Sequence, residues 1–272
     1  MKKIVALLAV LFSVVVPVQS QAAPGEKVVI IDSYFDKSKI TGLVEFVCLA
    51  NDKCVNTASP KPGLGSDAVN HGTVMANVAR QQNATATLVL IQTEEVTFNK
   101  KTGAFSVSTL NGSDFIKALT WVNTNKSSVS AVSFSYNLTM TSAKIGECKV
   151  STVPGVANAK TDSEIRSLVA SLKSAGIPVL AAAGNFNNKP LQYPACLTDV
   201  ISVGSTGQPG YHQTNVKVLA TIINSVDNTS SMTTVSPWLG TVDFNTSAAT
   251  VAVASNWKSI PAQNNKVNIL YN

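Results

Sequence analysis

Short, almost continuous apolar runs recur along this chain. They cover residues 28–31, 86–91, 131–135, 177–183 and 200–203. Runs of this length without polar alternation are typical of parallel strands that are covered on both faces. We therefore predict a buried strand at each of these positions.

Two segments between these runs have apolar residues at helical spacing. They are residues 114–122 and residues 162–175, and Gly176 follows the second segment where a helix C-terminal cap belongs. Helices that alternate with strands favour right-handed βαβ units, so we predict an open α/β sheet. In such sheets ligands bind at the carboxyl ends of the strands. The stretch of residues 208–237, rich in Asn, Thr and Ser, is either a long loop or a strand pair.

The N-terminus has the pattern of a secretory signal peptide. Lys2 and Lys3 precede an apolar segment, residues 4–18, and small residues follow at Ala22 and Ala23. We predict a signal peptide over residues 1–22, one domain over residues 23–272, and a secreted or periplasmic location. The alternative is an uncleaved membrane anchor, but the apolar segment is short for one and no later segment offers about 18 apolar residues in a row.

Composition limits the other classes of function. The chain is 45% hydrophobic and 13% charged, as suits a globular protein. Its formal net charge is +6, and its Lys and Arg residues are scattered along the chain. No basic run is interleaved with aromatic residues, which argues against a nucleic-acid partner. We find no phosphate-loop or dinucleotide signature and expect no cofactor. We expect a monomer that has no membrane association after signal cleavage.

The four cysteines favour disulfides, because an even number in an exported chain is typical of them. Cys48 and Cys54 are close enough in sequence to close a small loop, which would leave Cys148 to pair with Cys196. Free buried thiols are the alternative. No C-x-x-C pair exists and the chain has only two histidines, so we expect no metal site.

Four short segments carry candidate chemistry. Asp32 ends the first predicted strand, His71 opens a stretch of small residues, Asn185 follows Gly184 in a turn, and Ser247 precedes small residues. Each alone has an ordinary structural interpretation, as a cap, a structural histidine or a turn. Together they supply an acid, a base, a nucleophile and an oxyanion donor for acyl transfer. Backbone N–H groups at the start of a helix after Ser247 would also face the developing negative charge.

These segments resemble the subtilase (S8-type) serine peptidases. The family's His-Gly-Thr and Ala-Ala-Gly-Asn motifs are intact at residues 71–73 and 182–185, while its Asp-Ser/Thr-Gly and Gly-Thr-Ser-Met-Ala motifs resemble residues 32–34 and 245–249. The strand at residues 132–135 and the segment at residues 193–204 are also similar to family segments. The resemblance covers the chain from Val28 to about Ala254.

The resemblance implies a three-layer subtilisin-like fold, a mostly parallel sheet with helices on both faces. It implies a triad of Asp32, His71 and Ser247, with Asn185 completing the oxyanion hole. Ser135 and Gly184 would line a cleft for a protein or peptide substrate. Cys196 stands where some family members carry a cysteine, which supports its pairing.

Several positions depart from the family pattern. Tyr34 and Asn245 each stand where the family has Gly, and Thr250 replaces its usual Pro. Residues 24–26 lead directly into the first strand, so we expect no prodomain within this sequence. The leading hypothesis is a serine endopeptidase. The alternatives are a weak or inactive subtilase-like protein that binds peptides or a partner, and a different hydrolase.

Overall fold

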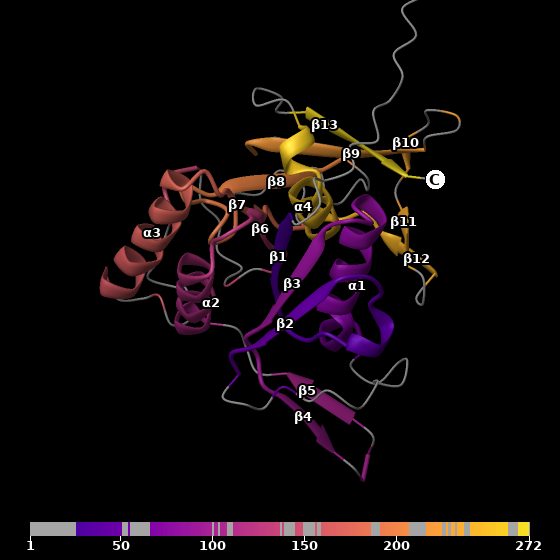
Figure 1. The fold of residues 1–272 in the computed structure, drawn as a ribbon, viewed down its shortest axis with the longest axis horizontal. Coiled ribbons are helices and arrows are strands. Elements are labelled where there is room, and N and C mark those ends of the chain that lie inside the picture. Colours follow the sequence, from indigo (N-terminus) through magenta and orange to yellow (C-terminus); the bar gives the residue numbers. More distant parts are fainter. Residues whose placement is uncertain are drawn as a thin grey trace, which may run out of the picture.

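The computed structural model describes most of the chain after its N-terminal segment (Figure 1). The described residues are 26–50, 54, 66–99, 101–102, 104–107, 111–136, 138, 145–148, 156, 159–185, 191–206, 216–224, 227, 230–231, 233–236, 240–260 and 266–271. The signal peptide predicted over residues 1–22 lies outside them.

Most of the described residues form helices and strands. The strands are β1 (Lys27–Asp32), β2 (Val44–Cys48), β3 (Thr87–Gln92), β4 (Val96–Asn99), β5 (Ala104–Val107), β6 (Val129–Phe134), β7 (Val179–Ala182), β8 (Ile201–Ser205), β9 (Val218–Asn224), β10 (Ser230–Ser231), β11 (Thr233–Ser236), β12 (Gly240–Asp243) and β13 (Lys266–Tyr271). The helices are α1 (Ser66–Gln82), α2 (Gly112–Thr124), α3 (Ala159–Ser174) and α4 (Thr246–Ser255), with 3-10 turns η1 (Lys37–Lys39) and η3 (Trp257–Ser259).

One large sheet forms the centre of the molecule. Its strand order is β10-β9-β8-β7-β6-β1-β3-β2, and β13 also pairs with β9. All its described pairings are parallel except β9 with β10. The five apolar runs of the sequence form β1, β3, β6, β7 and β8, so the predicted strands are confirmed. They are contiguous in the sheet, in the order β8-β7-β6-β1-β3.

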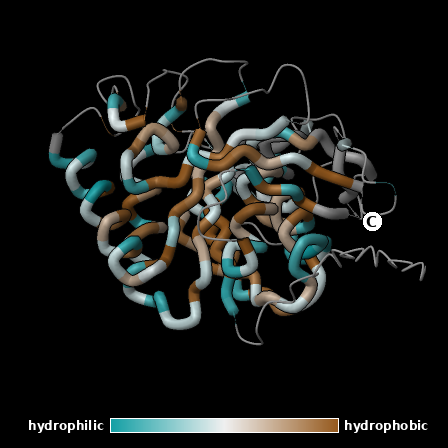
Figure 2. The backbone as a smooth tube through the Cα atoms, turned by 90° about the horizontal axis from the view of Figure 1, so that it is seen from above, coloured by the Kyte–Doolittle hydropathy of each residue, from teal (hydrophilic) through white to brown (hydrophobic). Residues whose placement is uncertain are grey.

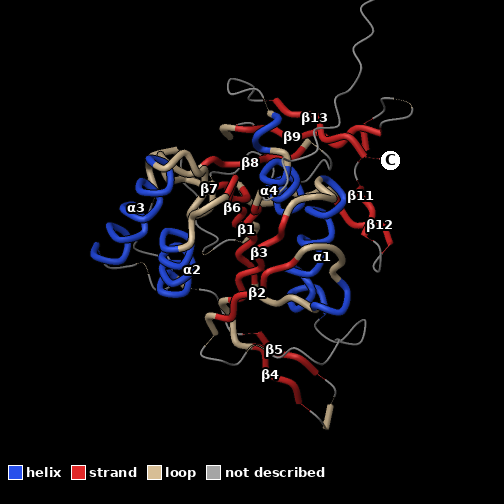
Figure 3. Tube along the Cα trace, in the orientation of Figure 1, coloured by secondary structure: helices blue, strands red, loops and turns tan. Residues whose placement is uncertain are grey.

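Helices cover both faces of this sheet, which makes three layers (Figures 1 and 3). Alternate residues of β1 point to opposite faces, because side chains along a strand alternate. Val29 and Ile31 join a core cluster with residues of α2 and α3, whereas Val28 and Ile30 join a cluster with residues of α1 and α4. Figure 2 shows hydrophobic positions concentrated in the interior of the molecule. The three-layer α/β fold implied by the sequence is confirmed.

The two helices predicted from periodicity are α2 and α3. Helix α3 ends at Ser174, and Gly176 follows it with a φ of +75°, the left-handed conformation of a C-terminal cap. Strand β9 falls in the Asn-, Thr- and Ser-rich stretch whose structure the sequence left open. Two short hairpins, β4–β5 and β11–β12, lie apart from the large sheet.

Candidate active site

The candidate residues gather where neighbouring strands end. Asp32 is the last residue of β1, Ser135 follows β6, and Gly184 and Asn185 follow β7. These three strands are neighbours in the sheet and run parallel, so their carboxyl ends share one edge. This is the edge at which α/β sheets bind ligands.

Asp32 and His71 are in direct contact. The Nδ1 atom of His71, in α1, lies 2.9 Å from Oδ2 and 3.0 Å from Oδ1 of Asp32. The Asp32 side chain is fully buried, and its Oδ1 also accepts hydrogen bonds from the backbone N–H and the hydroxyl of Ser33. Because an ionised carboxylate can only accept, Nδ1 carries the proton, and Nε2 of a neutral ring is left as the acceptor.

The environment of His71 favours its protonated form. Burial alone lowers the pKa of His71 and is the largest single influence, but the charge of Asp32 and the hydrogen bond to it together outweigh burial. The net pKa therefore lies above the ordinary 6.5. A histidine in this environment accepts a proton readily and holds the resulting positive charge beside a negative one.

Gly72 and Thr73 hold α1 against the end of β1. A Cβ added to Gly72 would lie 2.4 Å from the carbonyl oxygen of Tyr34 and 3.0 Å from Cβ of Asp32, so only glycine fits there. The hydroxyl of Thr73 accepts a hydrogen bond of 2.8 Å from the backbone N–H of Asp36. Tyr34 is fully buried, and this burial, with the charge of Asp36, raises the pKa of its hydroxyl to about 12.

Ser247 lies in the first turn of α4, a helix buried at every position. Its hydroxyl donates a hydrogen bond of 2.7 Å to the backbone carbonyl of Ser135. Among the residues that the structure describes, no hydrogen bond joins Ser247 to His71. The side chain of Asn245 caps the helix, and its Oδ1 accepts hydrogen bonds from the backbone N–H groups of Ser247 and Ala248.

Asn185 is tied to the same helix terminus. Its Oδ1 accepts from the backbone N–H of Thr246 at 3.1 Å and from the Thr246 hydroxyl at 2.7 Å. With the oxygen of the amide engaged, the Nδ2 group is the part of Asn185 that can donate to a ligand. Gly184 before it has a φ of +104°, and an added Cβ there would lie 2.9 Å from the side chain of Gln192.

Tyr136 is a site residue that the sequence did not single out. Its ring meets the ring of His71 edge to face, with centroids 6.0 Å apart and planes at 81°. Burial raises the pKa of Tyr136 to about 12, helped by the negative charges of Glu94 and Asp32. The only available signal was its position directly after Ser135 at the carboxyl end of β6. Tyr136 and Ser135 thus bridge the two halves of the site, since one contacts His71 and the other accepts from Ser247.

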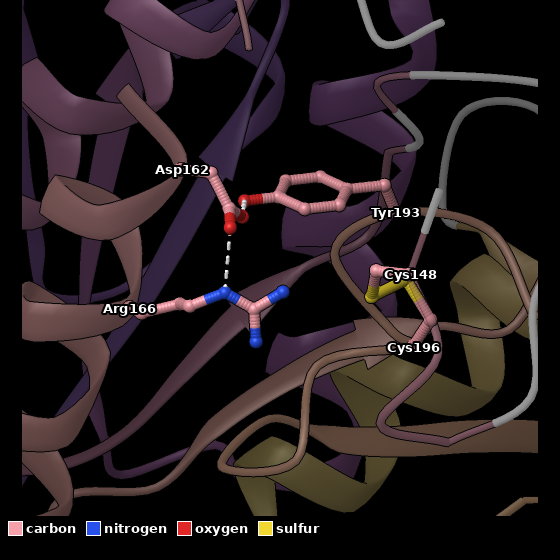
Figure 4. Close-up of a disulfide and its surroundings, with 5 residues drawn as sticks. All are labelled: Cys148, Asp162, Arg166, Tyr193 and Cys196. Atoms are coloured by element: carbon pink, nitrogen blue, oxygen red, sulfur yellow. Dashed lines mark hydrogen bonds and ion pairs between the residues drawn. A yellow bond between two sulfur atoms is a disulfide. The ribbon is translucent and has the colours of Figure 1, made fainter. Parts of the chain in front are cut away.

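Two disulfides join the pairs considered in the sequence, Cys48–Cys54 and Cys148–Cys196. Figure 4 shows the second bridge beside Tyr193. The Tyr193 hydroxyl donates to Asp162 at 3.2 Å, and Arg166 donates to the same carboxylate at 2.7 Å. These contacts fasten the segment after β7 to α3.

With this geometry established, comparisons with known proteins place the chain in a family. The family model for Peptidase S8, the subtilase family, matches residues 24–271. The chain therefore belongs to the subtilase family of serine peptidases. No curated protein matches the chain by sequence.

Solved structures share the fold at low sequence identity. The protease domain of PatA superposes with a TM-score of 0.55 at 15% identity, covering 86% of this chain and 78% of that one. The nisin leader peptidase NisP from Lactococcus lactis has a TM-score of 0.53 at 13% identity, covering 92% and 87%. Sphericase has a TM-score of 0.52 at 18% identity, covering 89% and 80%. These likenesses concern the fold.

The described residues contain neither a candidate membrane span nor a candidate metal cluster. None of their helices has the length and apolar character that crossing a bilayer requires. No group of three or more His, Cys, Asp and Glu side chains among them is arranged to hold a metal ion.

Proposed function

We propose that this subtilase is a secreted serine endopeptidase that cleaves peptide bonds through an acyl-enzyme on Ser247. The observation that carries the proposal is the hydrogen bond between His71 and the fully buried carboxylate of Asp32, at the same sheet edge as Ser247 and Asn185. Asp32 fixes the tautomer of His71 and stabilises the imidazolium, His71 is the general base, and Ser247 is the nucleophile. A protein that only binds peptides has no need of this set.

In the first half of the reaction, Oγ of Ser247 attacks the scissile carbonyl carbon and gives its proton to Nε2 of His71. The C=O electron pair moves onto oxygen, and this oxyanion accepts from Nδ2 of Asn185 and from the backbone N–H of Ser247. The carbon–nitrogen bond then breaks, and His71 passes its proton to the leaving amine. The acyl group remains on Ser247.

In the second half, a water molecule attacks the acyl carbon and gives a proton to Nε2 of His71. The bond from carbon to Oγ breaks as His71 returns the proton to Ser247, and a carboxylic acid leaves. For the first step, the hydroxyl of Ser247 must turn from the Ser135 carbonyl toward His71. Such a rearrangement is common, since catalytic hydrogen bonds often form only in the substrate complex.

The substrate cleft and the location belong to the same proposal. Ser135 and Gly184 line the cleft for a protein or peptide, and the enzyme acts as a monomer. Residues 1–22 are removed on export, and the mature domain begins at residue 23. The disulfides suit an oxidising compartment outside the cytosol, secreted or periplasmic. N-terminal sequencing of the exported protein tests the cleavage position.

Labelling with a fluorophosphonate probe tests the activity, because only an activated serine reacts with it. We expect wild type to be labelled on Ser247 and to digest an unfolded protein substrate at internal bonds. Ser247→Ala should lose both properties and still fold, with its melting temperature lowered by no more than the lost hydrogen bond to Ser135 explains. A correctly folded wild type that is neither labelled nor proteolytic would indicate an inactive relative that binds peptides or a partner.

A further inference from the structure

Two possible donors to a substrate carbonyl lie at the start of α4, and they differ in whether a protein group already engages them. One is the amide of Asn185, which follows β7, and the other is the backbone N–H of Ser247 in α4. The oxygen of the Asn185 amide accepts from Thr246, which leaves Nδ2 as its donor to a substrate, and no hydrogen bond engages Nδ2 among the residues that the structure describes. The backbone N–H of Ser247 is already engaged, because it donates to Oδ1 of Asn245 at 3.0 Å. Of these two donors, only Nδ2 of Asn185 can therefore donate to an oxyanion without first breaking a hydrogen bond within the protein.

The engaged donor is the one closest to the reaction. The oxyanion forms on a carbon that is bonded to Oγ of Ser247, so the backbone N–H of the same residue is the nearest main-chain donor. One N–H group makes one well-aligned hydrogen bond. The substrate oxygen and Oδ1 of Asn245 therefore compete for the N–H of Ser247.

The nucleophile is also in a resting position. The Ser247 hydroxyl donates to the Ser135 carbonyl at 2.7 Å, and the Ser247 side chain is almost completely buried. Both groups of Ser247 that act on the substrate, the hydroxyl and the backbone N–H, are thus satisfied within the protein. Each of these two hydrogen bonds must break before the carbonyl carbon can be attacked.

We infer that Asn245 is a positioning residue that closes the oxyanion site in the resting enzyme and must be displaced by the substrate carbonyl. Displacement does not undo the helix cap, because the N–H of Ala248 also donates to Oδ1 of Asn245, at 3.1 Å. The side chain can keep the second hydrogen bond while it yields the first. A glycine, which the related family motif has at this position, offers no such competitor.

This inference rests on the proposed function, and substitutions of Asn245 test it. Asn245→Gly removes the competing oxygen, and glycine is tolerated at helix N-caps. We expect it to raise kcat/KM and the second-order rate of fluorophosphonate labelling about threefold to tenfold, the worth of one net hydrogen bond. Asn245→Asp keeps both hydrogen bonds and adds a negative charge beside the oxyanion, so both rates should fall about tenfold or more.

Asn111 provides a matched control. It caps α2 in the same way, with its Oδ1 accepting from the backbone N–H groups of Ser113 and Asp114. Asn111→Gly should lower the melting temperature as Asn245→Gly does, and it should leave the labelling rate unchanged. A merely structural role for Asn245 predicts that the two glycine variants behave alike.

The possible outcomes separate this inference from the proposed function. The inference and the proposed function are both supported if wild type is labelled on Ser247, Asn245→Gly is labelled faster than wild type and Asn245→Asp is labelled more slowly. Wild-type labelling with an equal or lower rate in Asn245→Gly overturns the inference alone. Absence of labelling in wild type and in folded Asn245→Gly overturns both, whereas labelling only in the glycine variant supports the inference most strongly.

Discussion

The two faces of the sheet carry different kinds of helix. Helices α2 and α3 pack against each other on one face, and each presents a row of exposed polar residues to solvent. Helices α1 and α4 pack against each other on the opposite face, and α4 is buried at all ten of its positions. The proposed base and nucleophile, His71 and Ser247, both belong to this second pair.

The difference indicates separate roles for the two pairs of helices, one positioning the candidate site and the other covering the sheet. A catalytic side chain must be held within a fraction of an ångström, which buried helices wedged between a sheet and other elements provide. Amphipathic helices such as α2 and α3 stabilise the sheet by covering it, and their outer faces tolerate change. We therefore expect substitutions on the two faces to differ in kind, with activity lost on one and at most stability lost on the other.

The largest expected effect is that of His71→Ala. In the proposed mechanism His71 accepts the proton of Ser247, so its removal should lower kcat by roughly 10⁶, the size typical of losing a base from a serine peptidase. Steady-state kinetics on active-site-titrated protein measures it, with circular dichroism as the check on folding. Activity within tenfold of wild type would remove His71 from the mechanism.

Asn185→Leu should have the next largest effect. In the proposed mechanism Asn185 donates only as the oxyanion forms, so kcat should fall by about 10²–10³ while KM changes little. If Asn185 is instead an ordinary turn residue after Gly184, the folded protein will keep its kcat and lose only melting temperature. Measuring kcat per titrated site beside the melting temperature distinguishes the two.

The pH profile of kcat/KM tests the charge environment of His71. In the proposed mechanism the neutral ring of His71 is the active base. Because its pKa is raised above 6.5, activity should fall about tenfold per pH unit below that raised pKa. Stability should change in the opposite direction. Because folding favours the protonated ring, this contribution is complete below the unfolded pKa and is lost as the pH rises through the folded pKa. A half-maximal pH below 6.5 would contradict the predicted net effect of Asp32.

A pair of glycine substitutions compares the two faces directly. Gly72→Ala on α1 places a Cβ 2.4 Å from the Tyr34 carbonyl, which should cost about 1–3 kcal/mol of unfolding free energy and displace His71 from Asp32. Gly176→Ala beside α3 meets nothing within 4 Å but adopts a φ of +75°, at a cost of about 1–2 kcal/mol. Denaturant melts should show similar losses, and only Gly72→Ala should lose activity per folded molecule.

The smallest effect is expected for Arg166→Ala on α3. Arg166 forms an ion pair with Asp162 four residues earlier, and its side chain is 40% exposed. Pairs of this kind contribute about 0.3–0.5 kcal/mol, and salt screens them. The melting temperature should drop slightly and kcat/KM should not change. A marked loss of activity would show that the covering face also controls the site.

Local sequence patterns predicted the elements whose environment is uniform. The runs that became β1, β3 and β6 are buried on both faces, and α2 and α3 have one buried and one exposed face, so periodicity alone identified them. Strand β2, only half-buried at the sheet edge, has no such signal and was missed. Strand β9 lies in a polar stretch and becomes a strand because β8, β10 and β13 offer it hydrogen-bond partners.

Short motifs and strand ends were enough to predict the family, the layered fold and the candidates Asp32, His71, Asn185 and Ser247. How these residues contact one another depends on the folded chain. It set Tyr136 against His71, turned the Ser247 hydroxyl to Ser135, and gave the backbone N–H of Ser247 to Asn245. Periodicity and motifs depend on residues that are close in sequence, so they predict the secondary-structure element of a residue and its burial within that element. Which donor finds which acceptor depends on elements that are distant in sequence and adjacent only after folding.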